Sequence, residues 1–170
     1  EVTPEYLLKQ IAGARSSLLL VLIFTVVNLA MLLVDSGRYF LFSASVPYYL
    51  TMIGIIMDLE VGAAGIGTFT LIGLAISAVA LVLYLLCWLL SKKRSGWFVV
   101  ALVAFTLDTL ALLGLSYSFG TLTESVMDFV FHGWVIVELI QAIGANRKLK
   151  KLVEAEFDQE SVQEPVGPEL

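Results

Sequence analysis

The composition of this 170-residue chain excludes an ordinary water-soluble domain. Hydrophobic residues make up 59% of it and charged residues 15%, with a mean hydropathy of +0.92, whereas soluble domains contain about 45–50% apolar and about 25% charged residues. The net charge of −5 comes largely from acids near the C-terminus and says little about partners. The length allows one compact bundle and no separate catalytic domain.

Four apolar segments are long enough to cross a lipid bilayer. A charge-free apolar stretch of about 18 or more residues is typical of a transmembrane helix, and residues 62–90 carry no charge at all. We predict an all-α integral membrane protein whose domain 1–145 is a four-transmembrane-helix bundle. The predicted spans are 16–34, 68–90, 96–116 and 121–145.

A shorter apolar segment, residues 47–61, lies between the first two spans. Its apolar part runs only from Tyr48 to Met57, which is too short to cross about 30 Å of hydrocarbon. Asp58 and Glu60 end it. We therefore predict a short re-entrant or interfacial helix on the outer side.

Basic residues fall almost entirely on one side of a four-span arrangement. Nine of the ten precede the first span, join the second to the third or follow the fourth, and only Arg38 lies on the other side. Because positive charge marks the cytoplasm, both the N and C termini are predicted to be cytoplasmic. A fifth span at 47–61 would split these basic clusters, so four spans are preferred.

Two further features concern helix packing and the C-terminus. Gly73 and Ser77 form a small-xxx-small pair, which either lets another helix approach closely or reflects chance spacing in an apolar helix. Residues 146–170 are predicted to form an amphipathic surface helix, 146–157, on an anionic inner leaflet, followed by a disordered acidic tail, 159–170. That tail is a possible docking site for a cytoplasmic protein partner.

The main functional clue is a set of polar residues inside the predicted spans. Ionisable side chains there cost at least about 2.5–3.5 kcal/mol at the helix centre and usually face a cavity or a partner. Asp108 lies in the third span, and Asp128, His132 and Glu138 lie in the fourth. At about 1.5 Å per residue, Asp108, Asp128 and His132 fall in one layer of the outer half of the membrane, together with Asn28 of the first span.

Three interpretations of this layer stay open. Asp108, Asp128 and His132 are credible ligands for a divalent metal ion, with Asn28 or water completing the shell. The same groups could relay protons, because crowded carboxylates and histidine titrate near neutrality. They could also form an interhelical hydrogen-bond lock with no ligand.

Other polar residues extend this layer into a predicted ion or substrate path. Glu124 precedes Asp128 by one turn on the same helical face, and the path set is Asn28, Asp58, Glu60, Glu124 and Glu138. Simpler interpretations exist for most of them. Asn28 suits a helix–helix hydrogen bond, Asp58 and Glu60 suit solvated loop positions, and Glu138 suits an ion pair with Lys92 or Arg94.

The leading hypothesis is a non-enzymatic membrane protein that binds or conducts a cation, either a proton or a divalent metal, or a small polar solute. Four helices enclose a narrow path at best, so a homo-oligomer is expected. One alternative is a metal-dependent enzyme acting on lipid headgroups, with Asp58 or Glu60 as general base. Another is a scaffold or accessory subunit whose polar layer is only a lock.

Several classes have no support in the sequence. HExxH, GxSxG, P-loop and GxGxxG motifs are absent, and the basic residues flank membrane segments instead of forming a nucleic-acid site. The strong basic bias and the lack of any Asn-x-Ser/Thr sequon favour a bacterial plasma membrane as the location.

Overall fold

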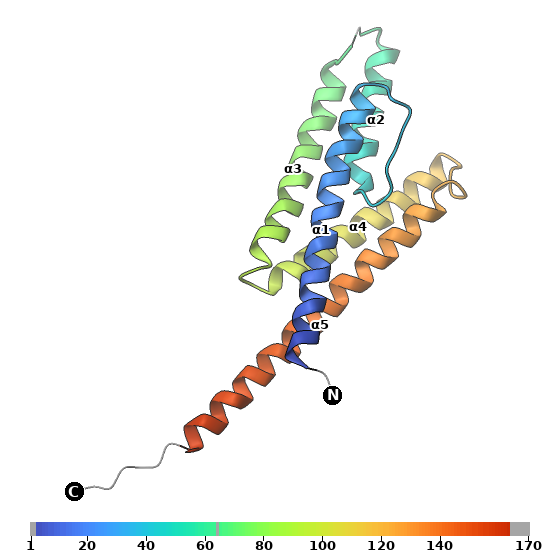
Figure 1. Cartoon of the computed structure of the whole chain (residues 1–170). Helices are drawn as coiled ribbons and strands as arrows, with labels where there is room; N and C mark the ends of the chain where they lie inside the picture. Colours follow the sequence, from blue (N-terminus) through green and yellow to red (C-terminus); the bar gives the residue numbers. More distant parts are fainter. Residues whose placement is uncertain (1–2, 64, 164–170) are drawn as a thin grey trace, which may run out of the picture.

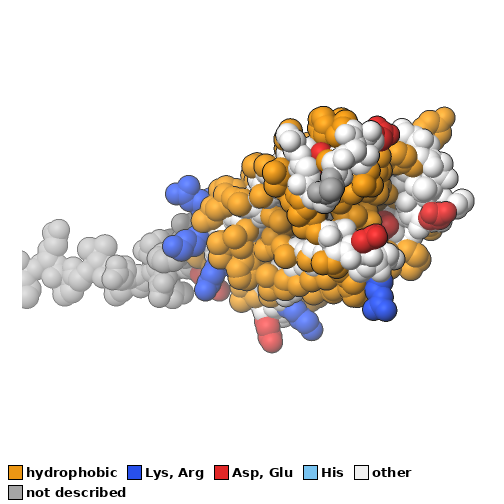
Figure 2. Space-filling view, turned by 90° about the horizontal axis from the view of Figure 1, so that it is seen from above, with side chains coloured by type: hydrophobic (Ala, Val, Ile, Leu, Met, Phe, Trp, Pro, Cys, Tyr) orange, Lys and Arg blue, Asp and Glu red, His pale blue; other side chains and the backbone are white. Residues whose placement is uncertain are grey.

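The computed structural model describes residues 3–63 and 65–163, and side chains within these ranges as far as Glu156. Figure 1 shows five helices in these ranges: α1 (Pro4–Leu33), α2 (Ser45–Glu60), α3 (Thr68–Leu90), α4 (Gly96–Ser118) and α5 (Val126–Gln163). All of them except α2 are long and apolar enough to cross a membrane. The chain is therefore an all-helical membrane protein with four candidate spans, and its large apolar side chains cover most of the outer surface (Figure 2).

The first span is part of a longer helix than the apolar pattern indicates. Thr3 caps α1, its hydroxyl accepting a hydrogen bond from the backbone N–H of Tyr6 at 3.3 Å, and Pro4 occupies the first helical position. A proline is tolerated there because its missing N–H has no partner in the first turn. The segment before residue 16 therefore continues straight into the span.

The helix of the fourth span begins at Val126 and not at 121 as predicted. Gly120 adopts a φ of 69° and the backbone N–H of Thr121 bonds to the carbonyl of Ser116 at 2.9 Å. This left-handed turn closes the C-terminus of α4. The N–H of Thr121 thus closes α4, while its carbonyl accepts from the N–H of Ser125 at 3.0 Å in the turn that precedes α5.

Helix α5 runs unbroken past the predicted end of the span at 145. No glycine or proline interrupts residues 146–163, and the helix extends away from the bundle beyond the start of α1 (Figure 1). The predicted surface helix is therefore the continuation of α5, and residues 159–163 are helical instead of disordered. Most of the predicted acidic tail, residues 164–170, lies outside the described residues.

The loop after α1 folds back into the bundle before α2 begins. The backbone N–H of Ala44 donates to the Thr25 hydroxyl at 2.8 Å, which places the start of α2 about 12 Å below the end of α1. From there α2 rises beside α3 (Figure 1). This path suits a re-entrant segment, but its depth in a membrane stays a prediction.

Helices α2 and α3 approach each other through small residues. A Cβ atom on Gly73 would lie 2.7 Å from the carbonyl oxygen of Leu50, and one on Gly54 would lie 2.5 Å from that of Phe69. The Ser77 hydroxyl donates to the carbonyl of Pro47 at 2.8 Å. The close approach predicted at Gly73 and Ser77 is confirmed, and its partner is α2.

The bundle has two chemically different ends. Lysine and arginine lie at the start of α1, between α3 and α4, and on α5 after residue 146; we call this the basic end. Arg15 of α1 lies over the ring of Trp88 near the end of α3, with its guanidinium carbon 5.8 Å from the ring centre. The opposite end carries Asp35 after α1, Glu60 at the end of α2 and Glu124 before α5, together with one basic residue, Arg38; we call it the acidic end. Which end faces the cytoplasm stays a prediction.

Candidate functional site

The carboxylate of Asp108 caps the buried N-terminus of α2. The backbone N–H groups of Ser45 and Val46 each donate to it at 2.8 Å, and Asp108 is only 4% exposed. The N-cap residue of α2 is Ala44, which has no side chain for this task, and a carboxylate is favoured at a helix N-terminus. Helix α4 thus satisfies donors that α2 cannot satisfy itself.

His132 of α5 completes this cluster and lies against Asp108. Its Nε2 is 3.1 Å from Oδ2 of Asp108, and its Nδ1 is 2.8 Å from the backbone oxygen of Asp128. A carbonyl oxygen can only accept, so Nδ1 carries a hydrogen. Asp108 and His132 therefore form a buried pair that joins α4 to α5 at the start of α2.

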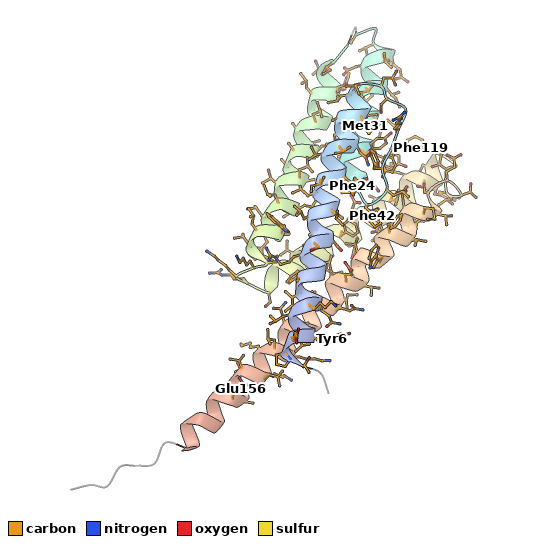
Figure 3. All side chains as sticks on the ribbon, viewed as in Figure 1. Tyr6, Phe24, Met31, Phe42, Phe119 and Glu156 are labelled. Atoms are coloured by element: carbon orange, nitrogen blue, oxygen red, sulfur yellow. The ribbon has the colours of Figure 1, made fainter. Side chains whose placement is uncertain are left out.

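Asn28 holds the returning loop in place above this pair. Its amide nitrogen donates to the carbonyl of Phe40 at 2.7 Å and to the Ser43 hydroxyl at 2.8 Å, and its oxygen accepts from the N–H of Phe40 at 2.8 Å. Phe24 and Phe42, labelled in Figure 3, pack between α1 and this loop, with their ring centres 6.4 Å apart. The side chain of Asn28 therefore bonds to the loop after α1. It bonds neither to another helix nor to the other residues of the predicted path.

The structure brings together only part of the predicted metal set. Asp108 and His132 meet, but Asp128 bonds to His132 through its backbone oxygen and not through its carboxylate. Within residues 3–63 and 65–156, no group of three or more His, Cys, Asp and Glu side chains is placed to hold one metal ion. A divalent metal at this position stays a prediction without support from the geometry.

Asp58 is buried and caps α3, contrary to the expectation of a solvated loop acid. Its carboxylate accepts hydrogen bonds from the N–H groups of Phe69 and Thr70 and from the Thr70 hydroxyl, at 3.1, 2.8 and 2.6 Å. Burial acts to raise the pKa of Asp58, but these hydrogen bonds outweigh it and hold the pKa below its ordinary value. Glu60 is exposed, as expected for a solvated acid.

The position of Asp58 also removes it as a general base for the Asp108–His132 cluster. Asp58 lies near the end of α2 and Asp108 caps its beginning, so the two carboxylates are about 20 Å apart along the helix. Glu60 lies still farther along. The role that the enzyme alternative gives these two acids therefore does not fit the fold.

Glu138 forms a different contact from the predicted ion pair. Its carboxylate accepts a hydrogen bond from the hydroxyl of Ser17 on α1. The only ion pairs among the described side chains are His132 with Asp108 and Lys150 with Glu154, so neither Lys92 nor Arg94 pairs with Glu138. The residue joins α5 to α1 nearer the basic end.

A cavity at the acidic end collects the remaining acids. We call it the tyrosine pocket; it measures about 310 Å³, and its walls include Tyr39, Tyr48, Tyr49, Phe119, Glu124 and Asp128. Tyr39 comes from the loop after α1, Tyr48 and Tyr49 come from α2, and Phe119 lies at the tip of the α4–α5 turn (Figure 3). Three separate segments of the chain therefore meet around this cavity.

The two carboxylates of the tyrosine pocket have no cationic partner. Neither Glu124 nor the carboxylate of Asp128 takes part in any ion pair or hydrogen bond among the side chains described. The Thr121 hydroxyl, which also lines the cavity, is buried without a hydrogen-bond partner in the same part of the chain. Polar groups that the protein leaves unsatisfied at a cavity are available to a ligand or to water.

A larger cavity of about 690 Å³ lies between α3 and α4 and reaches Asp108. Its walls are almost entirely apolar, with Leu83, Val103 and Leu107 among them, and they open on the lipid-facing side of the bundle. In a membrane, the hydrocarbon chains of lipids fill such a space. This larger cavity therefore offers little polar chemistry, in contrast to the tyrosine pocket.

The chain matches no protein-family model, no curated protein and no solved structure. The functional interpretation therefore depends on the geometry alone.

The sequence pattern identified the acids of the site but missed its aromatic walls. Tyr39, Tyr48 and Tyr49 look like interfacial aromatics, which are common beside membrane spans. Their spacing gives no sign that the loop turns back into the bundle. The sequence did contain one signal: these three tyrosines lie in or before a segment that is too short to cross the membrane.

Proposed function

We propose that this membrane protein binds a small cation in the tyrosine pocket at its acidic end. The observation that carries the proposal is the pair of acids, Glu124 and Asp128, which line a cavity and form no ion pair among the described side chains. Two acids that line a cavity and have no ion-pair partner in the described structure favour entry of a cation.

Binding fits the geometry better than open conduction. Tyr39 of the pocket wall contacts Ser43 through the two hydroxyls at 2.9 Å. The Asp108–His132 pair lies deeper in the bundle than Asp128 of the pocket. Deeper still, Phe98, Phe105 and Leu139 fill the centre of the bundle. A cation that enters from the acidic end therefore meets a packed, apolar core.

In this proposal the buried Asp108–His132 cluster holds a wall of the tyrosine pocket in place. Asp108 and His132 fix the start of α2, and the first turns of α2 carry two of the tyrosines. The polar layer predicted as one ion site thus divides into a structural part, Asp108 and His132, and a ligand-facing part, Glu124 and Asp128.

Thermal unfolding of the purified protein in detergent micelles tests the proposal. A ligand that binds the folded state raises the melting temperature in proportion to the logarithm of its concentration. We expect at least one chloride salt among sodium, calcium and propylammonium to raise it at constant ionic strength, and Asp128→Asn combined with Glu124→Gln to remove that rise. Glu60→Gln is the matched control, since it removes an exposed acid at the same end outside the pocket.

Two results would contradict a cation site. One is a melting temperature unaffected by all three salts. The other is an identical rise in the wild type and in the double variant, which would locate any binding elsewhere.

A further inference from the structure

We infer that the ligand class of the tyrosine pocket is a small alkylammonium ion carrying N–H groups, an assignment that rests on the proposed cation site. Three features of the cavity lead to this choice: its aromatic faces, its formal charge and its unsatisfied hydroxyl.

The aromatic rings meet at steep angles and form a partial cage. The ring centres of Tyr39 and Tyr48 are 4.9 Å apart at 69°, and those of Tyr48 and Tyr49 are 5.7 Å apart at 86°. Tyr49 in turn stacks with Phe119 at 6.3 Å and 12°. Rings set at right angles around a cavity present both faces and edges to it, and the faces attract organic cations.

The negative charge of the cavity comes from its two carboxylates and not from its phenols. Burial raises the pKa of Tyr39 above its ordinary value, more than the hydrogen bond to Ser43 lowers it, and the nearby Asp128 carboxylate raises it further. Burial and the neighbouring Tyr49 likewise raise the pKa of Tyr48. These phenols stay neutral at physiological pH, so the acidic groups of the cavity are Glu124 and Asp128.

The ligand set does not suit a metal ion. Calcium takes 6–8 oxygen ligands and magnesium demands octahedral geometry, whereas the pocket offers two carboxylates surrounded by rings. A cavity of about 310 Å³ is at the small end of the range for organic ligands. A bare monovalent ion would leave most of its aromatic wall without contact.

The hydrogen-bonding groups favour a protonated amine over a quaternary ammonium. The buried Thr121 hydroxyl has no partner in the described part of the chain, and its oxygen can accept a hydrogen bond, as can both carboxylates. An ammonium group with N–H donors satisfies these acceptors with charge-assisted bonds. A quaternary nitrogen offers no donor and leaves the hydroxyl unsatisfied.

Calorimetric titration of the full chain in micelles with propylammonium chloride, tetramethylammonium chloride and sodium chloride tests this assignment at constant ionic strength. We expect propylammonium to bind at least about tenfold more tightly than sodium and more tightly than tetramethylammonium. Asp128→Asn should weaken propylammonium binding about tenfold or more.

A pair of substitutions at Tyr48 separates ring contact from general packing. Tyr48→Phe keeps the aromatic face and should bind propylammonium within about threefold of the wild type, whereas Tyr48→Leu removes the face and should bind about fivefold more weakly or worse. The melting temperature without ligand shows whether each variant is folded. If Tyr48→Leu does not fold, propylammonium binding to the Asp128→Asn variant tests the assignment instead.

The outcomes distinguish this inference from the proposed function. Binding of sodium or calcium that depends on Asp128, with no propylammonium binding, overturns the alkylammonium assignment and leaves the cation site standing. Tetramethylammonium binding as tight as propylammonium overturns the role of the N–H donors. Absence of binding by every cation overturns both proposals.

Discussion

Two aspartates of this chain cap helices to which they do not belong. Asp108 of α4 binds the first N–H groups of α2, and Asp58 of α2 binds the first N–H groups of α3. The N-cap residues of those helices, Ala44 and Gly67, make no side-chain cap bond. Because a buried helix N-terminus without partners is costly, both distant carboxylates act as structural anchors.

The capping role predicts that neutralising Asp108 destabilises the protein far more than neutralising Asp128. Asp108→Asn removes one partner of a buried pair and should lower the free energy of unfolding by about 3 kcal/mol. Asp128→Asn should change it by less than about 0.5 kcal/mol, because the carboxylate it neutralises makes no bond in the described structure. Reversible denaturant titration in micelles measures both. Equal losses in the two variants would show that Asp108 is no more structural than Asp128.

The cap formed by Asp58 predicts a dependence of stability on pH. Its pKa is lowered in the folded state, so its contribution is complete above the ordinary carboxyl pKa of about 3.9 and is lost as the pH falls through the folded-state pKa. Asp58→Asn should therefore melt below the wild type at pH 7, and the difference should shrink below about pH 4. Glu60→Gln, an exposed neighbour, serves as the control. A difference that stays constant down to pH 2 would contradict the capping role.

At the scale of the elements, α2 is held by its neighbours and not by its own sequence. It buries its start against Asp108, its middle against Gly73 of α3 and its end against the first turn of α3. Backbone-to-backbone approach of this kind is typical of small residues between membrane helices. The helix is therefore a fixed wall of the tyrosine pocket.

The contact between α2 and α3 predicts that alanine substitutions at two glycines have different effects on stability. Gly73→Ala places a methyl group against the backbone at Leu50 and should cost about 1–3 kcal/mol of stability through overpacking. Gly114→Ala meets no atom within 4 Å and should be neutral or stabilising by up to about 1 kcal/mol, since alanine favours helix. The two variants can be compared by their melting temperatures in micelles. A stable Gly73→Ala protein would show that the two helices can separate without loss.

At the scale of the whole molecule, four apolar helices and one short helix define two ends of opposite chemistry. The nine basic residues predicted to share a side do lie toward one end of the bundle, and the tyrosine pocket opens at the other. The orientation in the membrane decides which compartment supplies the ligand. Positive charge favours the cytoplasm for the basic end.

Cysteine labelling in intact cells tests this orientation. A membrane-impermeant maleimide should label Glu60→Cys and Ser118→Cys from outside, and should label Lys93→Cys only after permeabilisation. The native Cys87 is fully buried and gives a low background. The reverse pattern, with Lys93→Cys labelled from outside and Glu60→Cys only after permeabilisation, would contradict this orientation.

The sequence by itself determined the class of the protein and the places of its spans. Charge-free apolar segments are unfavourable in water, so apolar helices were predicted at about 68–90 and 96–116, and α3 and α4 lie at these positions. The same reasoning placed Asp108, Asp128 and His132 in one cluster, of which the structure brings Asp108 and His132 together through their side chains. Helical periodicity and hydropathy depend on residues that are close together in the chain, so the sequence alone reveals them.

Only the tertiary structure decided what each polar group does. The loop after α1 turns back because Asn28 and Thr25 bind its backbone, and no local pattern reveals a bond between residues twelve or nineteen positions apart. That return brings the start of α2 to Asp108, which turns a predicted metal ligand into a helix cap, and it brings three tyrosines to Asp128. The function of a carboxylate in this chain is set by which donors reach it, and that depends on the path of the backbone through space.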